Sequence, residues 1–193
     1  MIIQLGYPLD DPTTMKGFNP YLKNAVYATV ASYPHLTDLT IRAFATAYIA
    51  LFLPIDDYFA DKPGPISEFN CRLIQGIEQE HPLLEAYARL LRELPKHWDP
   101  VMADMMRQSA MTFLTSLVVE RQLEDAKVSL YSSQCSGVLT YIHSQLPNVS
   151  DLARSIRTMT GTSLIHIMFA FPSGVPPQIY LAVSFVFTRP TPH

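Results

Sequence analysis

The apolar run from Leu39 to Phe52 constrains the fold of this chain more than any other segment. Its apolar residues recur around most of the circumference of a helix, and a helix that is hydrophobic all round is normally buried. Thr37 or Asp38 can cap its start. Pro54 predicts a kink near its end, because proline removes a backbone donor. We therefore expect a central, buried helix.

The rest of the pattern is helical as well, which predicts an all-α fold. Prolines and capping residues separate the apolar segments, and strand-like elements are few. Lys62–Pro65 has the composition of a loop, and the serine-rich segment from Val128 to His143 lacks a helical period. The predicted helices cover residues 19–32, 39–52, 67–80, 83–94, a long stretch that opens at 99–100, and 151–160.

Length and composition favour one domain, residues 1–193, with a large buried surface. Of its residues 48% are hydrophobic and only 16% are charged, which is apolar for a soluble protein. The net charge of −3 gives no general attraction to nucleic acid or to anionic membranes. Cys71 and Cys135 have no metal-ligand spacing, which favours a reducing cytoplasm.

Targeting and membrane segments are not expected. Met1 to Pro12 lacks a basic region followed by an apolar one. Ala43 to Ile55 is too short to span a bilayer, and prolines interrupt the apolar stretch from Leu164 to Phe187. These features predict a soluble, cytoplasmic protein without a membrane span.

Three carboxylates, Asp56, Asp57 and Asp61, follow the central apolar run. Carboxylates repel one another, so a cluster of them is stabilised when a cation lies between them. Mg²⁺ prefers oxygen ligands and commonly takes one or two carboxylates together with substrate phosphate oxygens. The pattern predicts a pocket with metal and diphosphate at its mouth and hydrocarbon inside. A solvated acidic surface is the alternative.

Four ordered segments resemble the trichodiene synthase family, the fungal branch of class I terpene cyclases. Gln75–Pro82 is similar to the family string G-x-E-Q-x-H-P, and Val119–Gln122 to the end of the family's long middle helix. Ile156–Gly161 is similar to L-R-x-M-x-G, and Phe171-Pro172 follows at the family interval. Together with the acidic cluster, these matches cover roughly residues 20 to 183.

The resemblance implies a class I terpenoid synthase helical barrel that binds a prenyl diphosphate, with farnesyl diphosphate as the expected substrate. In such enzymes Mg²⁺ ions hold the diphosphate and help to break its C–O bond, which is electrostatic and metal-ion catalysis combined. The carbocation then cyclises in an apolar cavity and loses a proton. The family also suggests a homodimer.

The resemblance assigns the acidic residues in order. Asp56 corresponds to the first metal-bridging aspartate, and Asp57 to a second position that can support structure rather than metal. Asp61 departs from the common D-D-x-x-D spacing, because Ala60 occupies the expected position. One extra residue turns a side chain by about 100° around a helix.

The resemblance also assigns substrate-binding residues. Arg157 corresponds to the arginine that senses the diphosphate through two parallel hydrogen bonds, and Gly161 to a helix break that faces the cavity. Phe44, Tyr48 and Phe113 are candidates for cation–π contacts with the carbocation. The alternatives are an exposed helix arginine at position 157 and core positions for the aromatic residues.

Three more residues of the matched segments have structural alternatives. His81 is expected at a helix end rather than as a ligand. Glu78 and Gln79 are candidates for helix surface despite the motif that contains them.

The chain departs from the family in three places. The second metal motif, N-D-x-x-S-x-x-x-E, does not follow Arg157, so we expect an incomplete barrel that lacks its C-terminal helices. Residues 128–145 are an insertion relative to the family, and residues 183–193 are an aberrant tail. Both begin with Val-Ser, which suggests two retained introns.

Three hypotheses therefore remain. The first is a sesquiterpene cyclase. The second is an inactive helical remnant or a module that binds a prenyl diphosphate or a partner. The third is a prenyl diphosphate synthase, which would need a second D-D-x-x-D motif, and none appears after Asp61.

Overall fold

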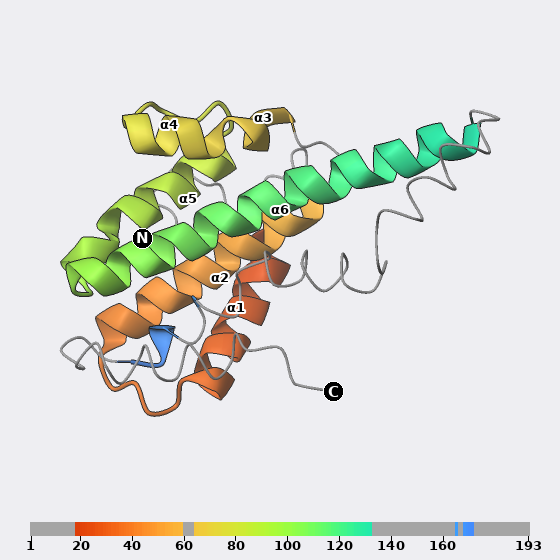
Figure 1. The fold of residues 1–193 in the computed structure, drawn as a ribbon. Coiled ribbons are helices and arrows are strands. Elements are labelled where there is room, and N and C mark those ends of the chain that lie inside the picture. Colours follow the sequence, from red (N-terminus) through yellow and green to blue (C-terminus); the bar gives the residue numbers. More distant parts are fainter. Residues whose placement is uncertain (1–17, 60–63, 133–164, 166–167, 172–193) are drawn as a thin grey trace, which may run out of the picture.

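The computed structural model describes residues 18–59, 64–132, 165 and 168–171 (Figure 1). The elements assigned within this part of the chain are all helices, as the sequence predicts for an all-α fold. In chain order they are α1 (Phe18–Ser32), α2 (Leu39–Phe59), α3 (Gly64–Ser67), α4 (Phe69–Gln75), α5 (Pro82–Glu93), the 3₁₀ helix η2 (Leu94–Lys96) and α6 (Pro100–Ser132).

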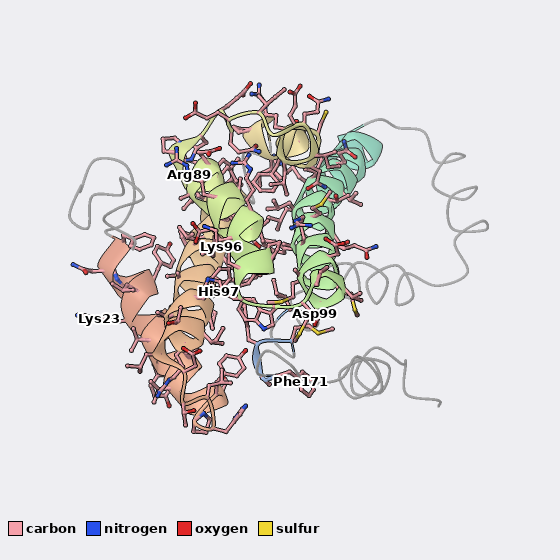
Figure 2. All side chains as sticks on the ribbon, turned by 90° about the vertical axis from the view of Figure 1, so that its left-hand side faces the viewer. Lys23, Arg89, Lys96, His97, Asp99 and Phe171 are labelled. Atoms are coloured by element: carbon pink, nitrogen blue, oxygen red, sulfur yellow. The ribbon has the colours of Figure 1, made fainter. Side chains whose placement is uncertain are left out.

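Helix α2 is the central element, as its apolar pattern predicts. Figures 1 and 2 show it lying between α1 and α5, and it packs against both. Asp38 caps its start, because Asp38 Oδ1 accepts the backbone N–H groups of Thr40 and Ile41 at 2.7 and 3.4 Å. Helix α2 continues through the buried Pro54 to Phe59, so the proline does not end it, and the kink stays a prediction.

Helix α2 is also the one helix in the described residues that is long and apolar enough to cross a membrane. More than half of the residues in its apolar window are buried inside the protein. The core helices of soluble proteins share these properties, so this observation is weak support for a membrane span.

The predicted helix from Ser67 to Glu80 is wrong at both ends. Gly64 and Pro65, which were expected in a loop, begin the short helix α3. At the other end α4 stops at Gln75, because Gly76 adopts a left-handed conformation with φ of 72°. The N–H groups of residues 76 and 77 bond back into α4, as in a Schellman motif. Residues 77–80 therefore form a connector without regular secondary structure that leads to α5.

Helix α6 begins where the sequence predicts, and it extends into the segment from Val128 onward that lacks a helical period. Asp99 Oδ1 accepts the backbone N–H groups of Val101 and Met102, both at 3.1 Å. The helix continues through residues 128–132, where the sequence lacks a helical period. No proline or glycine interrupts this stretch, and adding residues to an existing helix is easy compared with starting one. Residues 133–145 and 183–193 lie outside the described part of the chain.

A segment far along the chain completes the aromatic core. Phe169 is fully buried, and its ring lies 6.3 Å from that of Phe44 and 5.7 Å from that of Trp98, measured between centroids. His35 Nε2 lies 2.8 Å from the carbonyl oxygen of Ala170. Residues 168–171 therefore pack onto the first helices of the chain.

Candidate functional site at the C-terminal end of α2

The last turns of α2 carry the two described members of the acidic cluster, Asp56 and Asp57, which we call the acidic turn. Both residues are exposed, and about 100° of rotation around the helix separates them. Tyr21 on α1 donates its hydroxyl hydrogen to Asp57 Oδ2 at 2.8 Å. Asp56 has no hydrogen-bond or ion-pair partner within the described part of the chain. One carboxylate is therefore held, and the other is available to a ligand.

The electrostatic environment of the acidic turn favours a nearby cation. Partial desolvation raises the pKa of Asp56, and the adjacent Asp57 raises it further. Desolvation also raises the pKa of Tyr21, with smaller contributions from its hydrogen bond to Asp57 and from the charge of that carboxylate. A bound cation would reduce the repulsion between the two carboxylates.

Aromatic rings connect the acidic turn to the start of α5. The imidazole of His81 lies 5.4 Å from the ring of Tyr58 and 5.1 Å from that of Phe59. His81 also caps α5, because its Nδ1 accepts the N–H of Leu83 at 3.2 Å. Burial lowers the pKa of His81, and the neutral ring can accept at Nδ1 only when its proton is on Nε2. His81 therefore lies at a helix end, as predicted, but it caps the start of α5 and not the end of the preceding helix.

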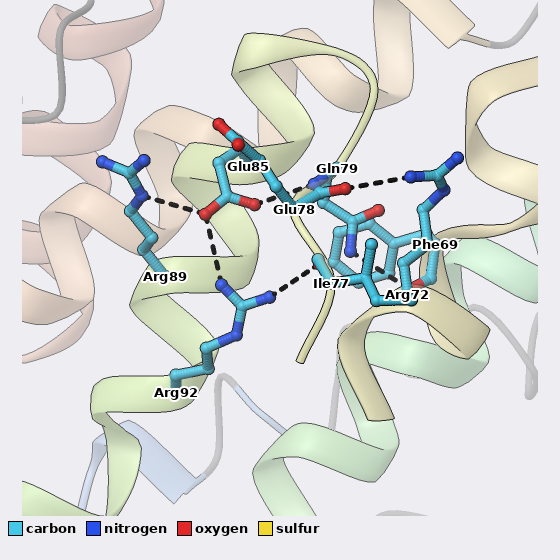
Figure 3. Close-up of polar contacts among 8 residues, drawn as sticks. All are labelled: Phe69, Arg72, Ile77, Glu78, Gln79, Glu85, Arg89 and Arg92. Carbon is cyan, nitrogen blue, oxygen red and sulfur yellow. Dashed lines mark hydrogen bonds and ion pairs between the residues drawn. The ribbon is translucent and has the colours of Figure 1, made fainter. Parts of the chain in front are cut away.

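The connector between α4 and α5 is held by a buried carboxylate, Glu85 (Figure 3). Glu85 Oε2 accepts the backbone N–H of Gln79 at 2.9 Å, and Glu85 Oε1 accepts from Arg89 and Arg92 at 2.9 and 3.2 Å. Arg92 also donates to the carbonyl of Ile77 at 3.2 Å. We call Glu85, Arg89, Arg92 and Gln79 the Glu85 cluster.

The Glu85 cluster shifts the acidity of its carboxylate. Burial alone would raise the pKa of Glu85, but the Gln79 N–H and the two arginines outweigh it and hold the pKa below its usual value. The sequence interpretation missed Glu85, although the spacing of Glu85 and Arg89 is that of a helical ion pair. No local sequence pattern indicates that Glu85 also accepts a hydrogen bond from the backbone N–H of Gln79.

The sequence left open that Gln79 lies on a helix surface, and this alternative is wrong. It is buried in the connector between α4 and α5, and its Nε2 donates to the carbonyl of Phe69 at 3.3 Å. Glu78 is exposed, and its carbonyl accepts from Arg72 at 3.0 Å. This part of the motif therefore has a structural role, since it sets the path from α4 into α5.

The three aromatic candidates for the substrate cavity lie in the packed core. Phe44 lies against Trp98, with ring centroids 5.1 Å apart, and Phe113 against Phe52 at 4.4 Å. Tyr48 is fully buried and accepts a hydrogen bond from the hydroxyl of Tyr87 at 2.8 Å. Core positions are the alternative that the sequence left open, and a role in contacting substrate stays a prediction.

The remaining site residues, Asp61, Arg157 and Gly161, lie outside the described residues. Within the described part of the chain, no three His, Cys, Asp or Glu side chains form a group that could hold a metal. Asp56 and Asp57 nevertheless fit the preference of Mg²⁺ for one or two carboxylates with phosphate oxygens as further ligands. The acidic turn could therefore supply part of a magnesium site.

Comparison with known proteins finds distant relatives that are all terpene synthases. No protein-family model matches the chain. An alpha-cuprenene synthase of Coprinopsis cinerea is 27% identical over 176 residues, which is 91% of this chain and 49% of the relative. An (E)-beta farnesene synthase of Metarhizium brunneum is 21% identical over 186 residues, 96% of this chain and 50% of the relative.

A third relative covers a shorter segment. A monoterpene synthase of Postia placenta is 24% identical over 106 residues, 54% of this chain and 32% of the relative. The chain thus spans half or less of the length of these three relatives, and the narrower resemblance to trichodiene synthases stays a prediction. The distant homologues of this chain are fungal terpene synthases, and they support its assignment to a terpene cyclase family.

Proposed function

We propose that this chain is part of a sesquiterpene cyclase that uses Mg²⁺ to ionise a prenyl diphosphate, with farnesyl diphosphate as the substrate. The observation that carries the proposal is the acidic turn, where Asp56 has no described protein partner beside a carboxylate that Tyr21 holds. Its position at the end of a buried apolar helix and the terpene synthase relatives support the same function.

In the proposed reaction, Asp56 would be the principal ligand of the cation and Asp57 would support it. Mg²⁺, when bound, would supply positive charge to stabilise the departing diphosphate. The C–O bond of the substrate breaks and its electron pair leaves with the diphosphate. The carbocation would then close a ring and transfer a proton to the departed diphosphate. Arg157 is proposed to donate two parallel hydrogen bonds to the diphosphate.

Replacing Asp56 with asparagine should reduce hydrocarbon formation by at least about 100-fold, because metal stabilisation is worth several kcal/mol and each 1.4 kcal/mol is a factor of ten. The measurement is gas chromatography of extracts after incubation with Mg²⁺ and farnesyl diphosphate. Chelation of the metal should have the same effect as the substitution.

The matched control is Asp104→Asn, which changes an exposed carboxylate on α6 and should leave product formation unchanged. Binding of farnesyl diphosphate without product would favour a binding module over an enzyme. Undiminished product from the Asp56 variant would contradict the proposed role of this residue.

A further inference from the structure

A residue outside every matched motif touches the acidic turn. Tyr21 lies near the start of α1, and its hydroxyl donates to Asp57 Oδ2 at 2.8 Å across 36 residues of sequence. Tyr21 is only partly exposed, whereas Asp57 is exposed. The hydrogen bond therefore ties an otherwise solvated carboxylate to a neighbouring helix.

The hydrogen bond from Tyr21 leaves three carboxylate oxygens of the acidic turn available to a cation. It occupies Oδ2 of Asp57, so that Oδ1 of this residue and both oxygens of Asp56 remain without a described partner. A carboxylate ligand that is itself hydrogen-bonded keeps one orientation, and loss of such an outer partner typically weakens metal binding about 10- to 100-fold. The phenol of Tyr21 has the position of such a partner.

We propose that Tyr21 is a positioning residue that fixes Asp57, so that Asp56 and Asp57 present their oxygens together to a divalent cation that carries a diphosphate. This inference rests on the proposed function and extends it to a helix that the acidic motif does not include.

A second hydrogen bond between the same helices provides a control. The hydroxyl oxygen of Thr46 on α2 lies 3.1 Å from that of Thr29 on α1, and it also lies 2.8 Å from the carbonyl oxygen of Arg42 in its own helix. Thr46 precedes Asp56 by ten residues, which places it about 15 Å away along the helix axis. Loss of the Thr46 hydroxyl thus weakens the α1–α2 interface without touching the acidic turn.

The test is the affinity of the full chain for Mn²⁺ in the presence of inorganic pyrophosphate, measured from the electron paramagnetic resonance signal of free Mn²⁺. Tyr21→Phe should weaken Mn²⁺ binding about tenfold, whereas Thr46→Val should leave it within about twofold of the native value. Thermal unfolding, followed by circular dichroism, verifies that both variants are folded. In an Asp57→Asn background, Tyr21→Phe should cause little further loss, because Tyr21 acts through Asp57.

The outcomes separate this inference from the proposed function. A native chain that binds Mn²⁺, an Asp56→Asn variant that does not, and a Tyr21→Phe variant with native affinity would together overturn the inference alone. Equal losses in the Tyr21 and Thr46 variants would also overturn it, since they would indicate a general effect of the helix interface. No Mn²⁺ binding by the native chain would overturn the proposed function and this inference with it.

Discussion

Replacing Phe44 with alanine is expected to lower the free energy of unfolding by about 3–5 kcal/mol, the usual cost of removing a buried phenylalanine. The Phe44 side chain is 1% exposed, and its ring contacts those of Trp98 and Phe169. The substitution leaves a void that these large neighbours fill only in part. Urea unfolding followed by circular dichroism measures the effect.

This experiment also separates the two interpretations of Phe44. If Phe44 is a core residue, its replacement should lower the free energy of unfolding by the whole of this amount. If Phe44 lines an open cavity, its replacement should have little effect on stability and should change the product instead. Tyr27→Ala is the matched control, because Tyr27 is 77% exposed on α1 and its loss should cost less than about 0.5 kcal/mol. A similarly small effect at Phe44 would contradict the packed core.

Replacing Glu85 with glutamine is expected to lower the free energy of unfolding by about 2–3 kcal/mol at pH 7, because hydrogen bonds to a buried charge are stronger than neutral ones. The variant keeps the size of the side chain but loses the negative charge that faces Arg89 and Arg92. Chemical unfolding at several pH values measures the difference between the native and variant proteins.

This difference should depend on pH in one direction. The pKa of Glu85 is lowered in the folded protein, so its contribution is present above the unfolded-state value, near 4.5, and is lost as the pH falls through the folded value. The stability of the native protein should therefore approach that of the variant progressively as the pH falls below 4.5.

A control on the same helix tests whether burial is responsible. Glu93 forms an exposed ion pair with Lys96 at 3.4 Å, and such pairs contribute about 0–1 kcal/mol. Glu93→Gln should thus change stability by less than about 0.5 kcal/mol at every pH. Equal effects at Glu85 and Glu93 would contradict a special role for the Glu85 cluster.

The elements that the sequence predicts well depend on local signals. The caps at Asp38 and Asp99 act on N–H groups two and three residues away, and the apolar circumference of α2 is a property of one segment. The connector after Gly76 was missed because a glycine within a helical pattern is compatible with either continuation or termination. The Schellman bonds that decide between them appear only in three dimensions.

In the candidate site, too, the features that depend on one segment were predicted, and the contacts between separate segments were not. The position of Asp56 and Asp57 at the end of the apolar helix follows from their order in the sequence. The hydrogen bond from Tyr21 and the contact of His81 with Tyr58 join segments that nothing in the sequence pattern relates. These contacts depend on how helices pack, which a pattern within one segment does not specify.

The burial of Phe169 among the first helices has a consequence for synthesis on the ribosome. Its partners Tyr33, Phe44 and Trp98 are translated roughly 70 residues earlier or more, which corresponds to about 4–14 s at 5–20 residues per second. During this interval the nascent chain lacks Phe169, so the aromatic surface that this residue covers in the folded protein is open. The protein is therefore expected to depend on chaperones while it is being translated.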